Sequence, residues 1–244
     1  MVTIKFLDKM TYIILAAGKG TRLFPLTSSF PKHLFKLNEN VSILQRMVRL
    51  IKKYDPQAQV VVVTGNEKNK VMNEVSDVVF INNPFYEVTN SIASLWFAKN
   101  YLTENVVILN GDIVASDKLM KEVITLPADK PAVLIDSSIK RDGDYNVQVQ
   151  DGKVVVMSKQ LISYFGEYAG ITKLDAKSAD LLRQKIEIMV EQNGYDQWYE
   201  NALVQMIIEN NFNLFYKDIC DYEWTEVDCV DDLLMAKNIE NNVR

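Results

Sequence analysis

The sequence predicts an α/β fold built on a doubly wound mixed sheet with a small antiparallel subregion, and three observations support this. Continuous apolar runs such as residues 12–17 end in polar or glycine-containing turns, which is typical of strands buried on both faces of a parallel sheet. Segments with apolar residues at helical spacing alternate with these runs. The turn Asp151-Gly152 separates two short strand patterns in the second half, which favours an antiparallel hairpin.

The first half of the chain alternates strand and helix patterns. Residues 41–54 show the helical pattern, because apolar side chains recur every three or four positions with lysine, arginine and glutamine between them. The expected strands lie at 12–17, 60–64, 78–82 and 105–109, and the expected helices at 41–54, 68–75, 91–101 and 118–124. This order predicts a Rossmann-like arrangement, in which helices cover a parallel sheet.

The second half is less regular and more antiparallel. Its expected strands lie at 132–136, 146–149, 154–157, 168–174 and 214–218, and its expected helices at 176–192, 198–209 and 231–239. No repeat, low-complexity tract or linker divides the chain. We therefore expect one domain over residues 1–244, with a first half of about 10–125 and a second half of about 126–244.

Composition excludes several classes of protein. The 244 residues carry a net charge of −5 without any block of five basic residues, so nucleic acid is not an expected partner. No apolar run approaches the roughly 18 residues of a membrane span, and charges interrupt the first ten positions, unlike a signal peptide. Cys220 and Cys229 lack the spacing of a zinc site or a disulfide framework. We expect a cytoplasmic protein that contacts no membrane.

Histidine is scarce, which limits the possible chemistry. His33 is the only one, and we expect it to lie partly exposed in a loop. Mechanisms that need a histidine base or a cysteine nucleophile therefore have almost no candidates. An enzyme of this composition must work with carboxylates, lysines, arginines and backbone groups.

Residues 15–23, LAAGKGTRL, place a glycine-containing turn directly after the first expected strand. Backbone amides in such a turn can approach phosphate oxygens, and Lys19, Arg22 and Lys32 supply cations nearby. The stretch is neither a Walker A motif nor GxGxxG, because Leu23 stands at the third glycine position. It predicts a triphosphate-binding loop, and a tight turn with solvated basic side chains is the alternative.

Two later segments carry candidate metal ligands. Asn110-Gly111-Asp112 ends a buried strand, and Thr225-Glu226-Val227-Asp228 precedes the last expected helix. Asp112 and Asp228 can hold one Mg²⁺ against phosphates, because that ion prefers one or two carboxylates plus phosphate oxygens and water. The alternative is that either aspartate caps a turn or a helix, where an acidic residue also favours the helix dipole.

These motifs resemble a known superfamily. LAAGKGTRL…P…PK at residues 15–32, with a strand ending in NGD at 110–112, is similar to the nucleotidyltransferases that make NDP-sugars and related CDP compounds. The resemblance covers most of the chain and is greatest for the phosphocholine cytidylyltransferase branch. The segments that resemble this branch are 86–95 (YEVTNSIASL), 158–159 (SK), 196–201 (DQWYEN) and 222–232 (YEWTEVDCVDD). The NGD form departs from some cytidylyltransferases and is closer to the sugar-1-phosphate enzymes.

The resemblance implies a fold of the nucleotide-diphospho-sugar transferase type, with a nucleotide-binding first half and an acceptor-binding second half. It implies an enzyme that transfers a cytidylyl group from CTP to a small phosphorylated acceptor, phosphocholine by its branch, with Mg²⁺ as cofactor and pyrophosphate as second product. An aminoalkylphosphonate, a phosphorylated amino acid or amide, and a sugar 1-phosphate stay open as acceptors. No residue fixes the base, and the chain can be a monomer or a homodimer.

Two other classes of function remain as alternatives. One is a non-catalytic nucleotide-binding regulatory subunit, which would have no need for a metal pair and a phosphate-binding lysine together. The other is a metal-dependent glycosyltransferase, whose D-x-D signature is absent near the NGD strand.

The resemblance also implies roles for individual residues. Lys32, Arg22 and Lys159 are implied to be catalytic, and Asp112 and Asp228 to hold Mg²⁺. The implied nucleotide-binding residues are Leu15, Ala16, Ala17, Gly18, Lys19, Gly20, Thr21, Arg22, Asn90, Ser91 and Gly111. The implied acceptor-binding residues are Lys159, Tyr195, Trp198, Glu200 and Trp224. Aromatic faces and carboxylates can form a box for an ammonium group, and the alternative for these aromatic residues is a place in the core.

The implied reaction agrees with the scarcity of histidine. A phosphate acceptor is already ionised at neutral pH, so its attack requires no general base. The protein has to align two anions and neutralise the charge that builds on the α-phosphate and on pyrophosphate. Lysines, arginines and a metal ion can do this.

Overall fold

The computed structural model describes residues 9–24, 26–27, 30–139 and 145–242. Within them the strands are β1 (Met10–Ala16), β2 (Gln59–Thr64), β3 (Val79–Asn82), β4 (Asn105–Asn110), β5 (Ile113–Ala115), β6 (Ala132–Asp136), β7 (Asn146–Gln150), β8 (Lys153–Ser158), β9 (Gly166–Leu174), β10 (Phe215–Asp218) and β11 (Trp224–Glu226). The α-helices are α1 (Ile43–Tyr54), α2 (Lys68–Glu74), α3 (Ser91–Phe97), α4 (Asp117–Leu119), α5 (Ala176–Glu191), α6 (Glu200–Asn210) and α7 (Val230–Asn241). A π-helical turn, Met120–Ile124, follows α4, and 3₁₀ turns lie at Thr21–Leu23, Lys32–Leu34 and Lys99–Tyr101.

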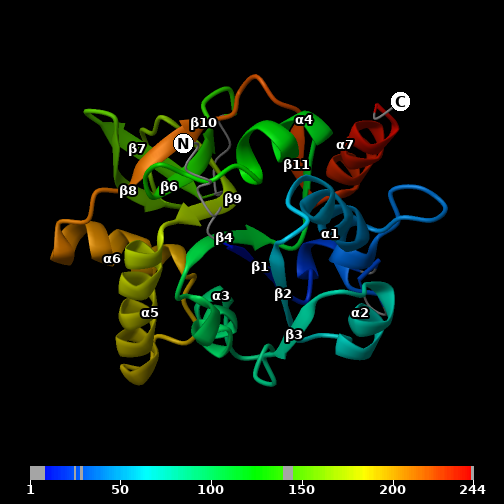
Figure 1. Cartoon of the computed structure of the whole chain (residues 1–244), viewed down its shortest axis with the longest axis horizontal. Coiled ribbons are helices and arrows are strands. Elements are labelled where there is room, and N and C mark those ends of the chain that lie inside the picture. The colour runs from blue at the N-terminus through cyan, green and yellow to red at the C-terminus, as the bar shows by residue number, and fades with distance from the viewer. Residues whose placement is uncertain (1–8, 25, 28–29, 140–144, 243–244) are drawn as a thin grey trace, which may run out of the picture.

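A mixed sheet forms the centre of the molecule (Figure 1). Its strand order is β10-β6-β9-β4-β1-β2-β3, and the hairpin β7–β8 joins it through pairing of β7 with β9. Strands β4, β1, β2 and β3 run parallel, whereas β9 runs antiparallel to β4 and β6. The predicted α/β fold with a mixed sheet is confirmed. Strands β1 to β4, which run parallel, all come from the first half of the chain, and β6 and β10 of the second half form another parallel pair.

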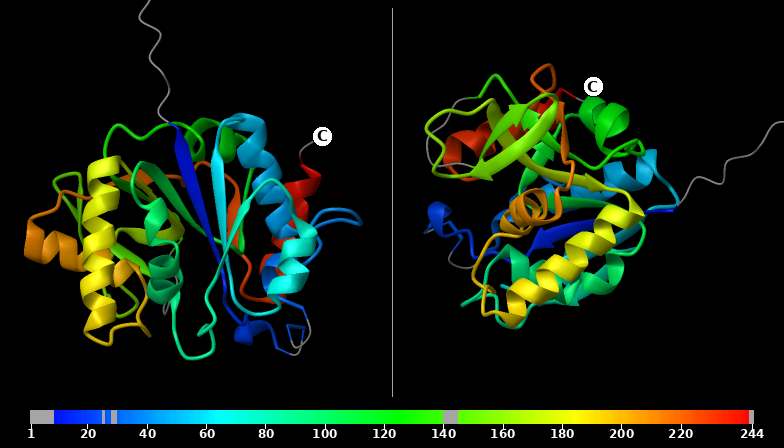
Figure 2. Two further views of the ribbon diagram at one scale, coloured as in Figure 1. Left: turned by 60° about the horizontal axis from the view of Figure 1, so that its bottom comes forward. Right: turned by 90° about the vertical axis from the view of Figure 1, so that its left-hand side faces the viewer.

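Helices cover both faces of this sheet (Figure 2). Along β1, the side chains of Tyr12 and Ile14 pack into the cluster that includes α1, whereas Ile13 packs into the cluster that includes α3 and α5. Successive side chains of a strand point to opposite faces, so a sheet covered on both sides requires a continuous apolar run. Ile13 and Ile14 are both fully buried, and burial of such a side chain contributes about 1.5–3 kcal/mol.

The sequence analysis does not predict the short antiparallel pair β5–β11. Ile113 of β5 stands opposite Glu226 of β11. The backbone N–H of Val227 donates to the carbonyl of Asp112 at 3.1 Å. Strands of three residues are too short to show a clear alternation of apolar and polar positions. This pair brings the two polar segments, 110–112 and 225–228, side by side.

The other elements agree with the expected ranges to within a few residues. The helix expected at 91–101 is divided into α3 and a 3₁₀ turn, and most of the helix expected at 118–124 is the π-helical turn. The expected hairpin is confirmed as β7–β8. Asp151 and Gly152 have φ angles of 51° and 74° at its turn, as a two-residue turn of type I′ requires.

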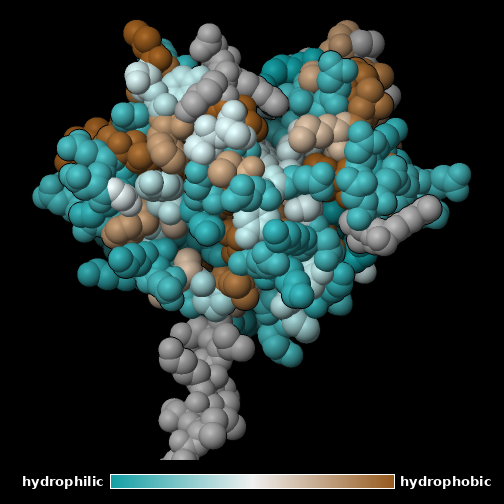
Figure 3. Space-filling model, turned by 90° about the horizontal axis from the view of Figure 1, so that it is seen from above, coloured by the Kyte–Doolittle hydropathy of each residue, from teal (hydrophilic) through white to brown (hydrophobic). Residues whose placement is uncertain are grey.

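Hydrophilic side chains predominate on the face shown in Figure 3, where hydrophobic ones lie in small separate groups. Cys220 and Cys229 are exposed free thiols. None of the helices in the described ranges is long and apolar enough to cross a membrane.

Candidate active site

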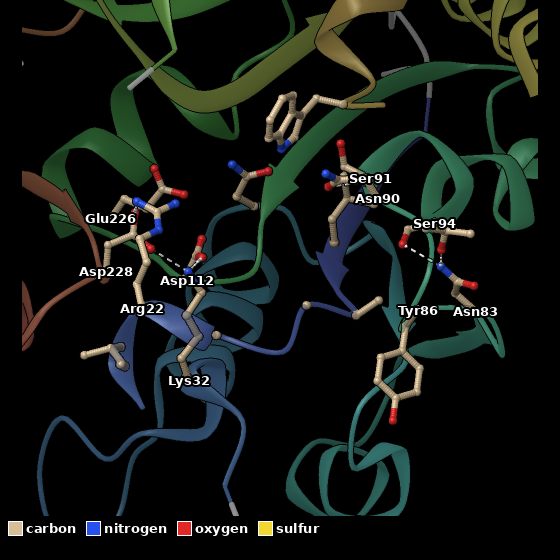
Figure 4. A pocket seen from close by; sticks show the side chains of 18 residues that line it. Arg22, Lys32, Asn83, Tyr86, Asn90, Ser91, Ser94, Asp112, Glu226 and Asp228 are labelled. Atoms are coloured by element: carbon tan, nitrogen blue, oxygen red, sulfur yellow. Dashed lines mark hydrogen bonds and ion pairs between the residues drawn. The ribbon is translucent and has the colours of Figure 1, made fainter. Parts of the chain in front are cut away.

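A cavity of about 260 Å³ lies at the carboxyl ends of the parallel strands (Figure 4). Leu15 and Asn110 lie at the ends of β1 and β4, Asn83 directly follows β3, and all three line the cavity. In open α/β sheets the carboxyl ends of the strands form the edge where ligands bind. The N-terminus of α3, with Asn90 and Ser91, closes part of its wall.

Four charged side chains interlock at one end of the cavity (Figure 4). The Nζ of Lys32 lies 2.8 Å from Oδ1 of Asp228 and also pairs with Asp112. The Nη1 of Arg22 lies 2.5 Å from Oδ2 of Asp228. The structure therefore brings together two of the implied catalytic cations and both of the implied metal ligands.

Glu226 joins this cluster, although no role for it follows from the sequence. One carboxylate oxygen from each of Asp112, Glu226 and Asp228 lies within 4.8 Å of the other two. Burial, followed by the charges of the two aspartates, raises the pKa of Glu226 well above its ordinary value. The sequence feature that could identify Glu226 as a site residue is its spacing of two positions from Asp228, because side chains two positions apart in an extended segment point to the same face.

The carboxylate cluster fits a hard divalent cation. Oδ1 of Asp112 is buried and has no hydrogen-bond partner among the described residues. A buried acceptor without a hydrogen-bond partner raises the free energy of the folded protein, so binding of a ligand at this oxygen is favourable. Mg²⁺ takes oxygen ligands from one or two carboxylates and completes its shell with phosphate oxygens and water. Asp112 and Asp228 suit that ion, and Glu226 adds a third carboxylate close by.

Lys32 keeps its charge in this setting. Burial acts to lower its pKa, but the three surrounding carboxylates outweigh burial and raise the pKa above its ordinary value. The neighbouring His33 is only 3% exposed, so the expectation of a partly exposed loop residue is wrong. Burial and the charge of Lys32 lower the pKa of His33 to about 3, and the imidazole is neutral.

The glycine-rich loop presents open backbone to the cavity. Gly18 lines the cavity, and a Cβ added to it would meet no other heavy atom within 4 Å. Gly20 has a φ of 64°, and Oγ1 of Thr27 donates to its carbonyl at 2.8 Å, which fixes the turn. Of the implied nucleotide-binding residues, those that line the cavity are Leu15, Ala17, Gly18, Gly20, Arg22, Asn90 and Ser91.

Ala16, Lys19 and Gly111, which are also implied to bind the nucleotide, are not among the lining residues. Ala16 is in the core at 2% exposure, and Nζ of Lys19 donates to the carbonyl of Glu87 at 3.4 Å. A Cβ on Gly111 would meet the carbonyl oxygen of Leu15 at 2.9 Å, so this glycine lets the ends of β1 and β4 approach. The side chain of Thr21 lies outside what the structure describes.

Three implied acceptor residues lie close together. The ring of Trp198 lines the cavity, and Nζ of Lys159 lies 4.8 Å from the centre of that ring. Glu200 is 4% exposed, and its Oε2 has no hydrogen-bond partner among the described residues. Burial raises the pKa of Glu200 to about 7, while a hydrogen bond from its own backbone and the charge of Lys159 act in the opposite direction. The cluster contains an aromatic face, a cation and a buried carboxyl group.

The other two implied acceptor residues lie outside this cluster, and Trp198 is the one member of the implied set in the cavity lining. Tyr195 is 42% exposed, and its carbonyl accepts from the backbone N–H of Asn90 at 3.0 Å. Trp224 is 4% exposed, and its indole N–H donates to Oδ2 of Asp136 at 2.8 Å. Tyr195 therefore braces the start of α3 through its backbone, and the polar atom of Trp224 is already bonded within the core.

Comparison with known proteins places this site in a family. Residues 11–147, more than half of the chain, match the model of the nucleotidyl transferase family. The chain belongs to this family. The family expected from the glycine-rich loop and the NGD strand is thereby confirmed.

Curated relatives extend the match beyond that region. The chain is 28% identical to the bifunctional protein GlmU of Methanococcus aeolicus over 96% of its own length and 56% of that relative. It thus spans about half the length of this relative. It is 24% identical to the CTP:phosphoglutamine cytidylyltransferase of Campylobacter jejuni, over 92% of the chain and 98% of the relative.

Solved structures share the fold. The CTP:phosphocholine cytidylyltransferase LicC from Streptococcus pneumoniae has a TM-score of 0.77 at 19% identity, covering 95% of this chain and 99% of that one. The inositol-1-phosphate CTP transferase from T. maritima has a TM-score of 0.74 at 18% identity, covering 97% and 98%. The expected Rossmann-like nucleotidyltransferase fold is therefore confirmed.

Proposed function

We propose that the chain is a Mg²⁺-dependent cytidylyltransferase that transfers a cytidylyl group from CTP to phosphocholine and releases pyrophosphate. The observation that supports this most directly is the ion-pair cluster in which Lys32 bridges Asp112 and Asp228 beside Arg22. Cations and metal-binding carboxylates at one end of a cavity are what a triphosphate and its metal ion require. The cytidylyltransferases among the relatives support the choice of CTP.

The nucleotide is proposed to lie along the glycine-rich loop. The exposed backbone at Gly18 allows close approach of phosphate oxygens, and Lys32 and Arg22 bind them as cations. Asp112 and Asp228 hold the metal ion, which when bound withdraws charge from the phosphates. Lys32 and Arg22 then exchange their carboxylate partners for phosphate oxygens, so each charge stays compensated.

The chemical step needs no proton acceptor on the protein. An ionised oxygen of the acceptor phosphate attacks the α-phosphorus of CTP, a P–O bond forms, and the bond to the β-phosphate oxygen breaks with pyrophosphate as the leaving group. Lys32, whose pKa is raised, neutralises charge at the reacting phosphate. His33 is buried and neutral beside it and takes no part.

The acceptor-side cluster supports a cationic acceptor. The buried Oε2 of Glu200 has no hydrogen-bond partner in the part of the chain that the structure describes, and a buried carboxylate is stabilised by a nearby cation. Trp198 supplies an aromatic face on which an ammonium group can stack. Lys159 already lies on that face and is free to meet the acceptor phosphate when the ammonium group takes its place. A sugar 1-phosphate carries no ammonium group and would leave Glu200 with Lys159 as its nearby cation.

The direct test is pyrophosphate release from CTP and Mg²⁺ with a panel of acceptors. The panel comprises phosphocholine, phosphoethanolamine, aminoethylphosphonate, phosphoglutamine and a sugar 1-phosphate. We expect phosphocholine to give the highest kcat/KM and Lys32→Gln to abolish turnover while the fold is retained. Higher turnover with another acceptor would correct the substrate. Nucleotide binding without turnover on any acceptor would favour a regulatory subunit.

A further inference from the structure

We infer that Asn83 is a positioning residue that makes the hydroxyl of Ser94 a hydrogen-bond donor for the nucleobase, and that this favours cytosine over uracil. The inference rests on the proposed function, because it assumes a nucleoside triphosphate in the cavity. It concerns the choice of base, which the sequence motifs leave open.

The amide of Asn83 is fully used within the protein. Asn83 lines the cavity but is only 1% exposed. Its Nδ2 donates to Oγ1 of Thr89 at 3.0 Å and to Oγ of Ser94 at 3.1 Å, and its Oδ1 accepts from the backbone N–H of Phe85 at 2.9 Å. A backbone N–H can only donate, so this last bond fixes which end of the amide is oxygen. Both amide hydrogens therefore point at hydroxyl groups (Figure 4).

The hydroxyl groups of Thr89 and Ser94 differ in whether their hydrogen remains available to a ligand. Thr89 accepts from Asn83 and donates its own hydrogen to the carbonyl of Phe85 at 2.8 Å. Ser94 accepts from Asn83, and its own hydrogen has no acceptor among the described residues. Ser94 lines the cavity and is 5% exposed. A buried donor without a partner costs about 1–3 kcal/mol, so this hydrogen calls for an acceptor on the ligand.

The position of Ser94 matches the base rather than the phosphates. Lys32, Asp112 and Asp228 lie at one side of the cavity, and Asn83 and Ser94 lie at the other (Figure 4). With the phosphates at the charged end, the base extends toward Ser94. Cytosine presents acceptors at O2 and N3, whereas uracil carries a hydrogen on N3. Ser94 Oγ accepts from Asn83 and keeps its own hydrogen for the ligand. When N3 of the base faces this hydroxyl, cytosine N3 accepts that hydrogen, whereas the N3–H of uracil leaves it without an acceptor.

Two substitutions test this inference by nucleotide binding. Asn83→Asp keeps the shape but turns a donor into an acceptor, so the Ser94 hydroxyl donates to the carboxylate and offers its lone pairs to the base. The ratio of the UTP to the CTP dissociation constant, from calorimetric titration with Mg²⁺ and no acceptor, should then fall at least tenfold. Ser94→Ala should weaken CTP binding about tenfold, the equivalent of one hydrogen bond, and leave UTP binding unchanged.

The control is Asn82→Asp, which adds the same charge at an exposed neighbouring position outside the cavity lining and should leave the ratio unchanged. Thermal unfolding checks that each variant is folded, and Ser94→Ala carries the test if Asn83→Asp is not. Binding of both nucleotides with a ratio that neither variant changes overturns the inference alone. Binding of neither nucleotide by the unmodified chain overturns the proposed function together with it.

Discussion

The ammonium group of Lys32 and the carboxylate of Asp228 form a 2.8 Å ion pair across 196 residues of sequence. Lys32 follows the glycine-rich loop, and Asp228 follows β11. Both side chains line the charged end of the cavity. Under the proposed function, binding of the metal ion and the triphosphate breaks this pair, because Asp228 then binds the metal ion and Lys32 a phosphate oxygen.

Arg22 should oppose metal binding when no nucleotide is present. Its side chain is 58% exposed and pairs with Asp228. Arg22→Gln should therefore tighten Mn²⁺ binding about threefold, since an exposed ion pair is worth less than 1 kcal/mol, and should weaken CTP binding. Electron paramagnetic resonance of free Mn²⁺ measures the first effect. Arg49→Gln, which removes an ion pair to Glu240 outside the cavity lining, should change neither.

Asp228→Asn should abolish most activity. The substitution removes a carboxylate from the metal cluster and a partner of Lys32, and the loss of one such electrostatic group typically costs about 10²–10³ in kcat. Pyrophosphate release measures kcat, and Mn²⁺ titration with CTP checks the metal site. Asp231→Asn, at the exposed start of α7, is the matched control and should behave as the unmodified chain. Full turnover in Asp228→Asn would contradict the proposed metal ligand.

Glu200 should make the protein less stable as the pH rises toward neutrality. Burial raises the pKa of Glu200 from 4.5 to about 7, so between these values the folded state holds a proton that the unfolded state has released. The free energy of unfolding therefore falls through this window, by about 3 kcal/mol for this group alone, and its contribution is constant above pH 7.

Glu200→Gln should remove that dependence. Urea unfolding at about pH 5 and about pH 8 measures it, and the variant should lose less stability between the two values than the unmodified chain. Groups that titrate in both proteins cancel in this comparison. Equal losses would show that the carboxyl group is ionised with an ordinary pKa.

Lys159 should act on the acceptor and not on the nucleotide. It lies on the ring of Trp198 and acts electrostatically on Glu200. Lys159→Met should raise the acceptor KM about tenfold and leave CTP binding unchanged, because a charged contact to a phosphate is worth about 1.5–3 kcal/mol. Lys153→Met removes the same charge from an exposed position of β8 and should leave both constants unchanged. Weaker CTP binding in Lys159→Met would move this lysine to the nucleotide side.

The patterns that predicted the fold correctly are local. Residues 12–17 identify a strand buried on both faces because the run is continuously apolar, and residues 41–54 identify a helix buried on one face because apolar side chains recur at helical spacing. No local sequence pattern shows that Asp112 lies close to Asp228, because their proximity depends on the pairing of the three-residue strands β5 and β11. Glu226 does have a local signal, its spacing of two residues from Asp228, but that signal is informative only when Asp228 is already placed in the site.

The implied acceptor-binding residues show a second limit of prediction from sequence. Trp198 and Trp224 stand in similar surroundings in the sequence, each beside acidic residues. The structure separates them, because Trp198 lines the cavity whereas Trp224 is buried with its indole N–H bonded to Asp136. The residue that decides this, Asp136, lies 88 positions away in sequence, so no local pattern can reveal it.

The antiparallel pairing of β5 with β11 also affects how the chain matures. Strands β1 to β4 are complete when residue 110 has been added, but the carboxylate cluster stays incomplete until residue 228 has been synthesised and β11 has docked. A ligand stabilises only the state that binds it, so under the proposed function a metal ion held by all three carboxylates would stabilise only molecules in which β11 has docked. A gain in melting temperature on adding CTP and Mg²⁺ that is lost in Asp228→Asn would report molecules with this completed cluster.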